Sequence, residues 1–300
     1  DGTALRSQYL IGCDGARSSV RSIVGIEFAG WDPTTCWIHA EVEVDEMPPF
    51  GLRGGGGIGP AEGGRVGVTL VEPEIPRDEP TIDDLRAALR RLDGTDYGAR
   101  NPRFVARFTD ATRQAVEYRR GRVLLAGDAA HIHAPLGGQG LNLGVQDAVN
   151  LGWKLAQVVA GTSPDDLLDT YQVERHPVAA RVLQNTMAQR SITAADDRSG
   201  ALRAFVVEVL GMHEPRTRVG GMIAGLDIAY DLGGDHPLVG RRMPDLELVT
   251  PQGSTRVYEL LHDARPVLVV LGEPGELHVA TPRVRVVLYG DDRALAEAAR

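Results

Sequence analysis

Two neighbouring stretches of the chain decide how it folds: Gly127-Asp128-Ala129-Ala130-His131 and Pro135-Leu136-Gly137-Gly138-Gln139-Gly140-Leu141-Asn142. Residues 122–126, just before them, form a short apolar run that predicts a strand, and a long helix is predicted to begin near Leu141. A strand, a glycine-rich loop and a helix in this order indicate an α/β layer. In such layers ligands bind beyond the carboxyl ends of the strands.

The residues of this loop suit a flat ligand that carries negative charge. Asp128 can accept hydrogen bonds from sugar-type hydroxyls, and the glycines let the backbone approach a ring without obstruction by a Cβ atom. The helix that follows would present unpaired N–H groups and the positive end of its dipole. A reduced flavin fits, because its pyrimidine edge is negatively charged. The alternative is a connection whose glycines serve only the geometry of the turn.

Together with residues 145–155, these stretches resemble the second FAD-binding motif of class A flavoprotein monooxygenases. The resemblance implies that Asp128 contacts the ribityl hydroxyls of FAD. It also implies that the following residues border the isoalloxazine ring: Pro135, Gly137, Gly138, Gln139, Gly140, Leu141 and Asn142.

A second motif, Asp14-Gly15-Ala16-Arg17-Ser18-Ser19-Val20-Arg21, follows a predicted strand at residues 9–12. Ser18 or Ser19 is expected to cap a short helix that ends near Gly25. The motif resembles the Asp-Gly motif that the same family uses near the FAD pyrophosphate and in NAD(P)H use. The resemblance makes Asp14, Gly15, Arg17 and Arg21 cofactor-binding candidates, since guanidinium groups pair with phosphate. The alternative is that the two arginines form a solvated helix face.

The resemblance covers nearly the whole chain and implies a mixed α/β (α+β) fold. The expected parts are a remnant of a glutathione-reductase-like FAD-binding domain (1–30), an inserted β-rich substrate domain (31–115), the rest of the FAD-binding domain with its following helices (116–230) and a thioredoxin-like C-terminal domain (236–300). That last domain lacks a redox cysteine pair and is expected to be structural, and its end is expected to be truncated.

The residue patterns add detail to these parts. Alternating apolar residues at 37–44 and 65–71 predict strands. Thr81 is expected to cap a helix, and the glycine run Gly54–Gly57 is expected to form a hairpin tip. A helical pattern over 165–190 should break or kink at Pro177. Further strands are expected at 266–272 and 284–289, and a helix at 293–300.

The composition excludes several classes of protein. The chain has 300 residues with 32 basic against 41 acidic side chains, a net charge of −9, which argues against an electrostatically driven nucleic-acid binder. Its apolar runs are too short to cross a membrane. Cys13 and Cys36 form no C-x-x-C pair, so neither a disulfide framework nor a zinc cluster is expected, and a cytoplasmic location is the default. His131 and His133 lack a third metal ligand at a suitable spacing, so no metal site is expected.

Other residues receive less specific expectations. The charged triplet Glu174-Arg175-His176 is expected on a solvated helix surface, and Cys13 is expected to be a small packed thiol. Four aromatic residues of the β-rich region either line a substrate pocket or pack a core: Trp37, Phe104, Phe108 and Tyr118.

The resemblance implies that NAD(P)H reduces FAD, that molecular oxygen forms a flavin hydroperoxide, and that one oxygen atom is transferred to an aromatic, polyketide-like or antibiotic substrate. No catalytic residue is assigned. The sequence leaves open whether the protein is a homodimer, which substrate it uses and whether it prefers NADH or NADPH. It also leaves open whether its role is biosynthetic or the inactivation of an antibiotic. The departure from the family is that no G-x-G-x-x-G follows a strand near the start, whereas such a βαβ unit binds the ADP portion of FAD. The chain therefore reads as part of a longer protein, expected to bind FAD weakly by itself. The alternative is a non-catalytic remnant that binds a ligand without turnover.

Overall fold

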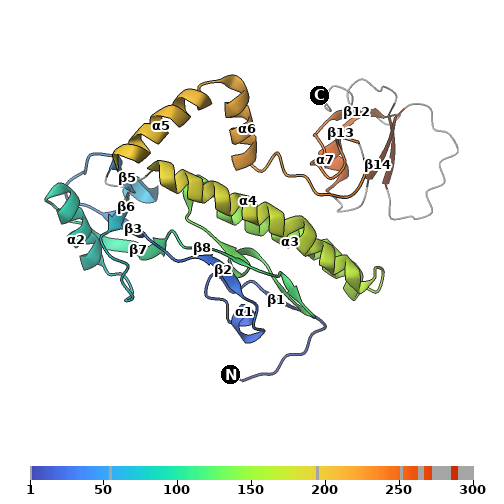
Figure 1. Cartoon of the computed structure of the whole chain (residues 1–300), viewed down its shortest axis with the longest axis horizontal. Coiled ribbons are helices and arrows are strands. Elements are labelled where there is room, and N and C mark those ends of the chain that lie inside the picture. The colour runs from blue at the N-terminus through green and yellow to red at the C-terminus, as the bar shows by residue number, and fades with distance from the viewer. Residues whose placement is uncertain are drawn as a thin grey trace. The chain divides into compact units, whose positions relative to one another are not determined.

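The computed structural model of the chain describes residues 2–53, 56–193, 196–234, 236–250, 253–262, 267–271 and 285–289. The chain divides into two compact units, Asp1–Ala224 and Gly225–Arg300. Both combine helices with sheets (Figure 1), so the mixed α/β class predicted from the sequence is confirmed.

The first unit begins with a three-stranded sheet that contains the ends of both sequence motifs. Its strands are β1 (Leu10–Gly12), β10 (Val123–Leu125) and β9 (Arg119–Arg120), in the order β1-β10-β9. β1 and β10 run parallel, with Gly12 opposite Leu125. Segments more than a hundred residues apart therefore end at one edge of the sheet.

A five-stranded antiparallel sheet forms the β-rich part of this unit, in the order β4-β5-β6-β3-β7. Its strands are β4 (Gly51–Arg53), β5 (Gly56–Pro60), β6 (Val66–Glu72), β3 (Cys36–Glu43) and β7 (Arg100–Thr109). Alternate residues of β3, such as Ile38 and Ala40, pack against Leu85 and Leu89 of α2 (Ile82–Asp93). Thr81 caps α2 as predicted. Of the predicted glycine hairpin tip, Gly56 and Gly57 lie in β5, and residues 54–55 lie outside the described residues.

A second three-stranded sheet, in the order β11-β8-β2, is formed by β2 (Phe28–Trp31), β8 (Thr112–Ala115) and β11 (His131–Ile132). Gly30 in β2 adopts a φ of +145°, and a Cβ atom there would lie 2.1 Å from the carbonyl oxygen of Thr112. Only glycine allows this close approach of the two strands.

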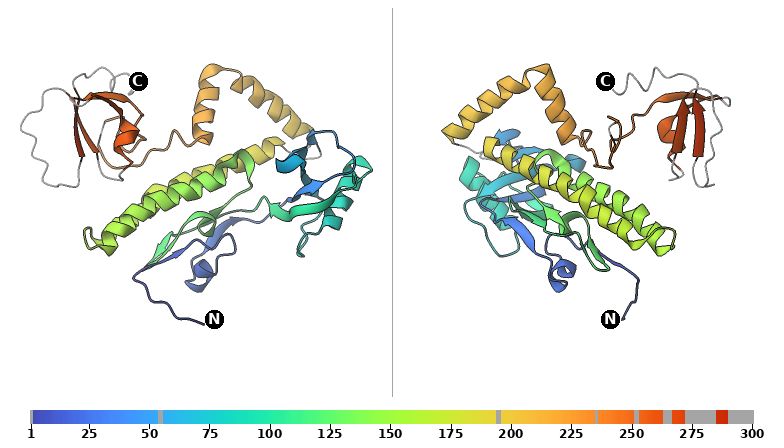
Figure 2. Two further views of the ribbon diagram at one scale, coloured as in Figure 1. Left: turned by 180° about the vertical axis from the view of Figure 1, so that it is seen from behind. Right: turned by 45° about the vertical axis from the view of Figure 1, so that its right-hand side comes forward.

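Two long helices, α3 (Gln139–Val159) and α4 (Asp169–Thr193), lie side by side along this unit (Figures 1 and 2). α3 begins two residues before the predicted start. Of the break or kink expected at Pro177, the break is wrong, because α4 continues through it. Pro177 removes the N–H that would bond the carbonyl of Val173; Val173 is 65% exposed, so water can reach that part of the helix.

Further short helices follow: the single turn Asp165–Leu168 before α4, and α5 (Asp197–Leu210) and α6 (His213–Ile223) after it. Within the described part of the chain, no helix is both long and apolar enough to cross a bilayer.

The second unit contains two pairs of strands and a short helix. β12 (Glu247–Thr250) pairs with β13 (Gly253–Arg256), and β14 (Val267–Leu271) runs parallel to β15 (Arg285–Tyr289). Leu248 packs against Val257 and Leu260 of α7 (Val257–Leu260). The two strands predicted near the end of the chain are thus confirmed, whereas the helix predicted at 293–300 lies outside the described residues.

Candidate functional site

The two sequence motifs meet where β1 and β10 end. Beyond the paired strands, the N–H of Ala126 donates to the carbonyl of Gly12 at 3.0 Å. The chain then turns through the 3-10 turns η2 (Gly127–Ala129) and η3 (Leu136–Gly138) into α3. This edge is where an open α/β layer binds its ligands.

Asp14 organises the loop of the Asp-Gly motif. Its carboxylate accepts hydrogen bonds from the Ser18 hydroxyl at 2.5 Å and from the Val20 N–H at 3.1 Å. The Ser18 hydroxyl in turn caps α1 (Ser19–Ile23) by accepting from the Arg21 N–H at 3.0 Å. The hydrogen bond from Ser18 holds the pKa of Asp14 below its ordinary value. The aspartate is therefore ionised and fixes the entry to α1.

Arg21 joins the two motifs to each other. Its guanidinium donates to the carbonyl oxygens of Ala129 at 2.8 Å and Ala16 at 2.9 Å, and lies 3.6 Å from the ring centre of Phe28. The residue is buried. Arg21 was expected to pair with phosphate, but in this arrangement it clamps the backbone, whereas Arg17 is exposed to solvent.

The loop that precedes α3 leaves the start of this helix open. Gly138 occupies the N-cap position with a φ of +64°, and no side chain caps the helix. Gly137 also has a positive φ, +73°. Pro135, Leu141 and Asn142 are exposed, so the loop faces solvent on one side. The first N–H groups of α3 can therefore serve an external acceptor.

Asp128 lies beside this open helix start because two glycines let the loop and the helix touch. A Cβ atom on Gly144 would lie 3.5 Å from the α-carbon of Gly127. The side chain of Asp128 is exposed. An exposed carboxylate, an uncapped helix and glycines without Cβ atoms form a cradle that fits the polyol and ring of a flavin.

Comparison with known proteins agrees with this geometry. Residues 1–186 match the family described as FAD binding domain, and residues 236–299 match the family described as aromatic-ring hydroxylase, C-terminal. The chain belongs to the FAD-dependent aromatic-ring hydroxylases.

Relatives of this chain include 12-dehydrotetracycline 5-monooxygenase/anhydrotetracycline 6-monooxygenase of Streptomyces rimosus, 46% identical over 88% of this chain and 56% of the relative. Rifampicin monooxygenase of Streptomyces venezuelae is 42% identical over 93% of this chain and 60% of the relative. Among solved structures, the anhydrotetracycline hydroxylase OxyS from Streptomyces rimosus superposes with a TM-score of 0.90 at 43% identity, over 96% of this chain and 62% of that one. The chain thus spans little more than half the length of the curated relatives.

Beneath the cradle, the chain contains a buried charge cluster that was not predicted from the sequence. Asp147 of α3 accepts hydrogen bonds from the Gly127 N–H at 3.2 Å and from Arg175 Nε at 2.8 Å, and lies 2.6 Å from His131 Nε2. Asp147 and Arg175 are fully buried. Burial by itself would raise the pKa of Asp147, but the hydrogen bonds and charges of His131 and Arg175 outweigh it and lower that pKa.

The expectation that Glu174-Arg175-His176 forms a solvated surface is therefore wrong. Arg175 points into the core, and Glu174 pairs with the buried Lys154 at 2.8 Å. Burial lowers the pKa of Lys154. The signal was present in α3, where Asp147 and Lys154 occupy the same helical stripe as the apolar residues Leu143 and Leu151.

The aromatic residues considered for the substrate pocket divide into two groups. Trp37 and Phe108 stack at 5.4 Å, and Phe104 lies 5.1 Å from His39, on the face of the five-stranded sheet opposite α2. Tyr118 is instead fully buried against His131 and Tyr171. Cys13, expected to be packed, is exposed.

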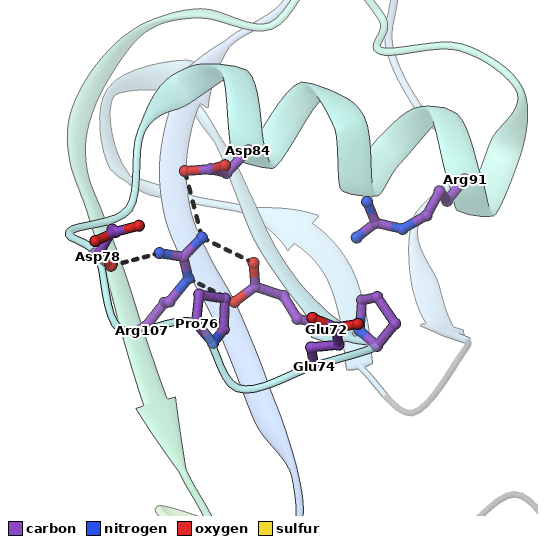
Figure 3. Close-up of a pocket in the computed structure, with 8 residues that line it drawn as sticks. Glu72, Glu74, Pro76, Asp78, Asp84, Arg91 and Arg107 are labelled. Atoms are coloured by element: carbon purple, nitrogen blue, oxygen red, sulfur yellow. Dashed lines mark hydrogen bonds and ion pairs between the residues drawn. The ribbon is translucent and has the colours of Figure 1, made fainter.

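A polar pocket at the other side of this sheet does not involve either motif. It lies between β6, β7 and α2, and Figure 3 shows the guanidinium of Arg107 between the carboxylates of Glu72 and Asp84. Arg107 donates to Glu72 at 2.6 and 3.0 Å. The arginine occupies the pocket and ties the sheet to α2.

Proposed function

We propose that this chain forms the flavin-ring and substrate-binding parts of an FAD- and NAD(P)H-dependent monooxygenase that hydroxylates an aromatic, polyketide-like substrate. The observation that carries the proposal is the uncapped start of α3 beside the exposed Asp128, held there by the contact of Gly127 with Gly144. The names of the tetracycline and rifampicin relatives support the substrate class.

In this proposal, each part of the site has its own task. Asp128 holds the ribityl hydroxyls, residues 135–142 border the ring, and the N–H groups of α3 stabilise negative charge on the pyrimidine edge. Bound FAD, reduced by NAD(P)H, supplies the activation of oxygen. The protein's own contribution is to position the substrate and to exclude water.

The aromatic face of the five-stranded sheet is the proposed substrate surface. Trp37, Phe104 and Phe108 offer ring faces for stacking, and His39 adds a polar group, hydrogen-bonded to the Thr69 hydroxyl at 2.9 Å. A surface depression lined by His39, Glu41, Pro60, Arg103 and Phe104 opens on the same sheet. Residues 31–115 would thus form the substrate domain, and residues 1–30 and 116–230 the FAD-binding domain.

The C-terminal unit completes the proposed arrangement as a thioredoxin-like domain with a structural task. Cys13 and Cys36 both belong to the first unit, so residues 236–300 contain no cysteine that could take part in thiol exchange.

Titration with FMN tests the ring site directly, because FMN carries the ring and ribityl chain but needs no ADP-binding unit. Asp128→Ala and Gly138→Ala are expected to weaken FMN binding about tenfold each, by loss of a charged acceptor and by a side chain in the cradle. Retention of wild-type flavin affinity in both variants would refute the proposal.

Matched controls separate binding from stability. Asp166→Ala removes an exposed carboxylate outside the motifs. Gly161→Ala places a side chain at a φ of +67° with nothing within 4 Å, as Gly138→Ala does at +64°. Both controls should leave the FMN affinity unchanged.

The second candidate function is that of a protein that binds an aromatic ligand without turnover. Such a protein would use the same aromatic face of the five-stranded sheet but would require no flavin. Binding of an aromatic ligand together with failure to bind FMN would favour it.

A further inference from the structure

Two side-chain amides converge on Gly137, in the loop of residues 135–142 that is proposed to border the flavin ring. This loop is called the ring loop below. A Cβ atom on Gly137 would lie 3.3 Å from Nε2 of Gln139, and 3.4 Å and 3.7 Å from Oε1 and Nε2 of Gln189. Gln139 comes from the start of α3 and Gln189 from the C-terminal part of α4. The absence of a side chain at Gly137 therefore leaves room for both amides.

These amides carry donors that the described residues do not use. The Nε2 atoms of Gln139 and Gln189 are shielded from solvent and find no hydrogen-bond acceptor within the described part of the chain. The same holds for Nδ2 of Asn185, one turn before Gln189 on α4. Gln139 as a whole is only 6% exposed. A buried donor without an acceptor costs about 1–3 kcal/mol, so an acceptor from outside the chain would be bound favourably.

The position of Gln189 connects the ring loop to the proposed substrate face. The next residue, Arg190, donates to the Thr35 hydroxyl at 2.7 Å, and its guanidinium lies 5.3 Å from the ring centre of Trp37. Adjacent residues of α4 thus contact the loop on one side and the aromatic sheet on the other.

We propose that the amides of Gln139 and Gln189 form a subsite for a carbonyl oxygen, supplied either by the pyrimidine edge of the flavin or by a keto group of the aromatic substrate. The inference deepens the proposed function and rests on it. A carbonyl oxygen has two lone pairs and no proton, so it suits two converging N–H donors. Asn185 extends the row of donors along α4 for a ligand with a second oxygen.

The test compares Gln189→Leu with Gln184→Leu, which removes an exposed glutamine from the same helix. Dissociation constants of the whole chain are measured by fluorescence titration, up to millimolar concentrations, with FMN, anthraquinone-2-sulfonate and anthracene-2-sulfonate. The last two ligands differ in their keto groups. Gln189→Leu is expected to weaken the binding of either FMN or anthraquinone-2-sulfonate, the two ligands with carbonyl groups, about tenfold. Gln184→Leu should leave the binding of all three ligands unchanged. Gln189→Glu, which exchanges the donor for an acceptor at constant size, should act in the same direction and replaces the leucine variant if that fails to fold.

The pattern of effects identifies the source of the oxygen. A loss confined to FMN assigns it to the flavin, and a loss confined to anthraquinone-2-sulfonate, with anthracene-2-sulfonate unaffected, assigns it to the substrate. Unchanged affinities of both variants for ligands that the wild type binds would mean that the amides hold only buried water, which overturns the subsite and leaves the proposed function intact. If the wild type bound neither FMN nor the anthraquinone, both proposals would fall.

Discussion

Two buried arginine–carboxylate clusters in this chain are alike in chemistry but differ in what they touch. In the first, Arg175 and Asp147 have no exposed side-chain surface; in the second, Arg107 and Glu72 are 12% and 7% exposed. Asp147 also accepts a hydrogen bond from the backbone N–H of Gly127, inside the cradle loop. Glu72 instead lies close to the thiol of Cys36, and Arg107 reaches the Asp78 carbonyl and Asp84.

A buried charge influences a binding site through the backbone groups that it holds in place. Loss of the Asp147 cluster would free Gly127 and so move Asp128, whereas loss of the Glu72 cluster would loosen the sheet from α2. Both should lower stability, but only the first should alter flavin binding. The following changes test this contrast.

Arg175→Met should have the largest effect. It leaves the buried carboxylate of Asp147 with His131 and the Gly127 N–H beside it but without its guanidinium partner, and breaking a buried ion pair costs about 3–5 kcal/mol. Urea unfolding followed by circular dichroism should show this loss, together with a loss of FMN binding. A change below about 1 kcal/mol would contradict the assigned role.

Asp147→Asn should cost less, about 1.5–3 kcal/mol at neutral pH, because the amide oxygen can still accept one hydrogen bond. The folded-state pKa of Asp147 is lowered, so its contribution to stability is present above the unfolded value of about 3.9 and is lost as the pH falls through the folded pKa. The stability difference between wild type and Asp147→Asn should thus narrow below about pH 4. A difference that stays constant down to pH 3 would speak against ionised Asp147.

The sequence could predict the glycine loop and the helix caps of this site but not the buried charge cluster beneath them. Glycine runs and caps act locally, so the turn at residues 127–138, a serine cap at Ser18 or Ser19 and the start of α2 at Thr81 followed from the residues themselves, and the structure selects Ser18. The partners of Arg175 and Arg21 lie 28 and 108 residues away, and no local pattern states such pairings. Charged residues are mostly solvated, which is why the triplet around Arg175 was misplaced.

Glu72→Gln tests the second cluster. It removes the charge that Arg107 pairs with at 2.6 and 3.0 Å, and a hydrogen bond to a charged group contributes about 1.5–3 kcal/mol. The unfolding free energy should fall, by less than for Arg175→Met, while the FMN dissociation constant stays at the wild-type value. An altered flavin affinity would erase the contrast between the two clusters.

Thr81→Ala should have the smallest effect, about 1 kcal/mol, the usual cost of losing an N-cap. The Thr81 hydroxyl accepts from the Asp84 N–H at 3.3 Å, and the Asp84 carboxylate accepts from the Thr81 N–H at 2.8 Å and lies 3.3 Å from Arg107. The cap and the Glu72 cluster therefore share Asp84, and a double-mutant cycle of Thr81→Ala with Glu72→Gln should give a coupling above about 0.5 kcal/mol. Combined with Asp147→Asn, Thr81→Ala should be additive within that same margin, because among the described residues no hydrogen bond or ion pair joins the cap to the cradle. Coupling in the second cycle but not in the first would mean that the cap is linked energetically to the cradle and not to the Glu72 cluster.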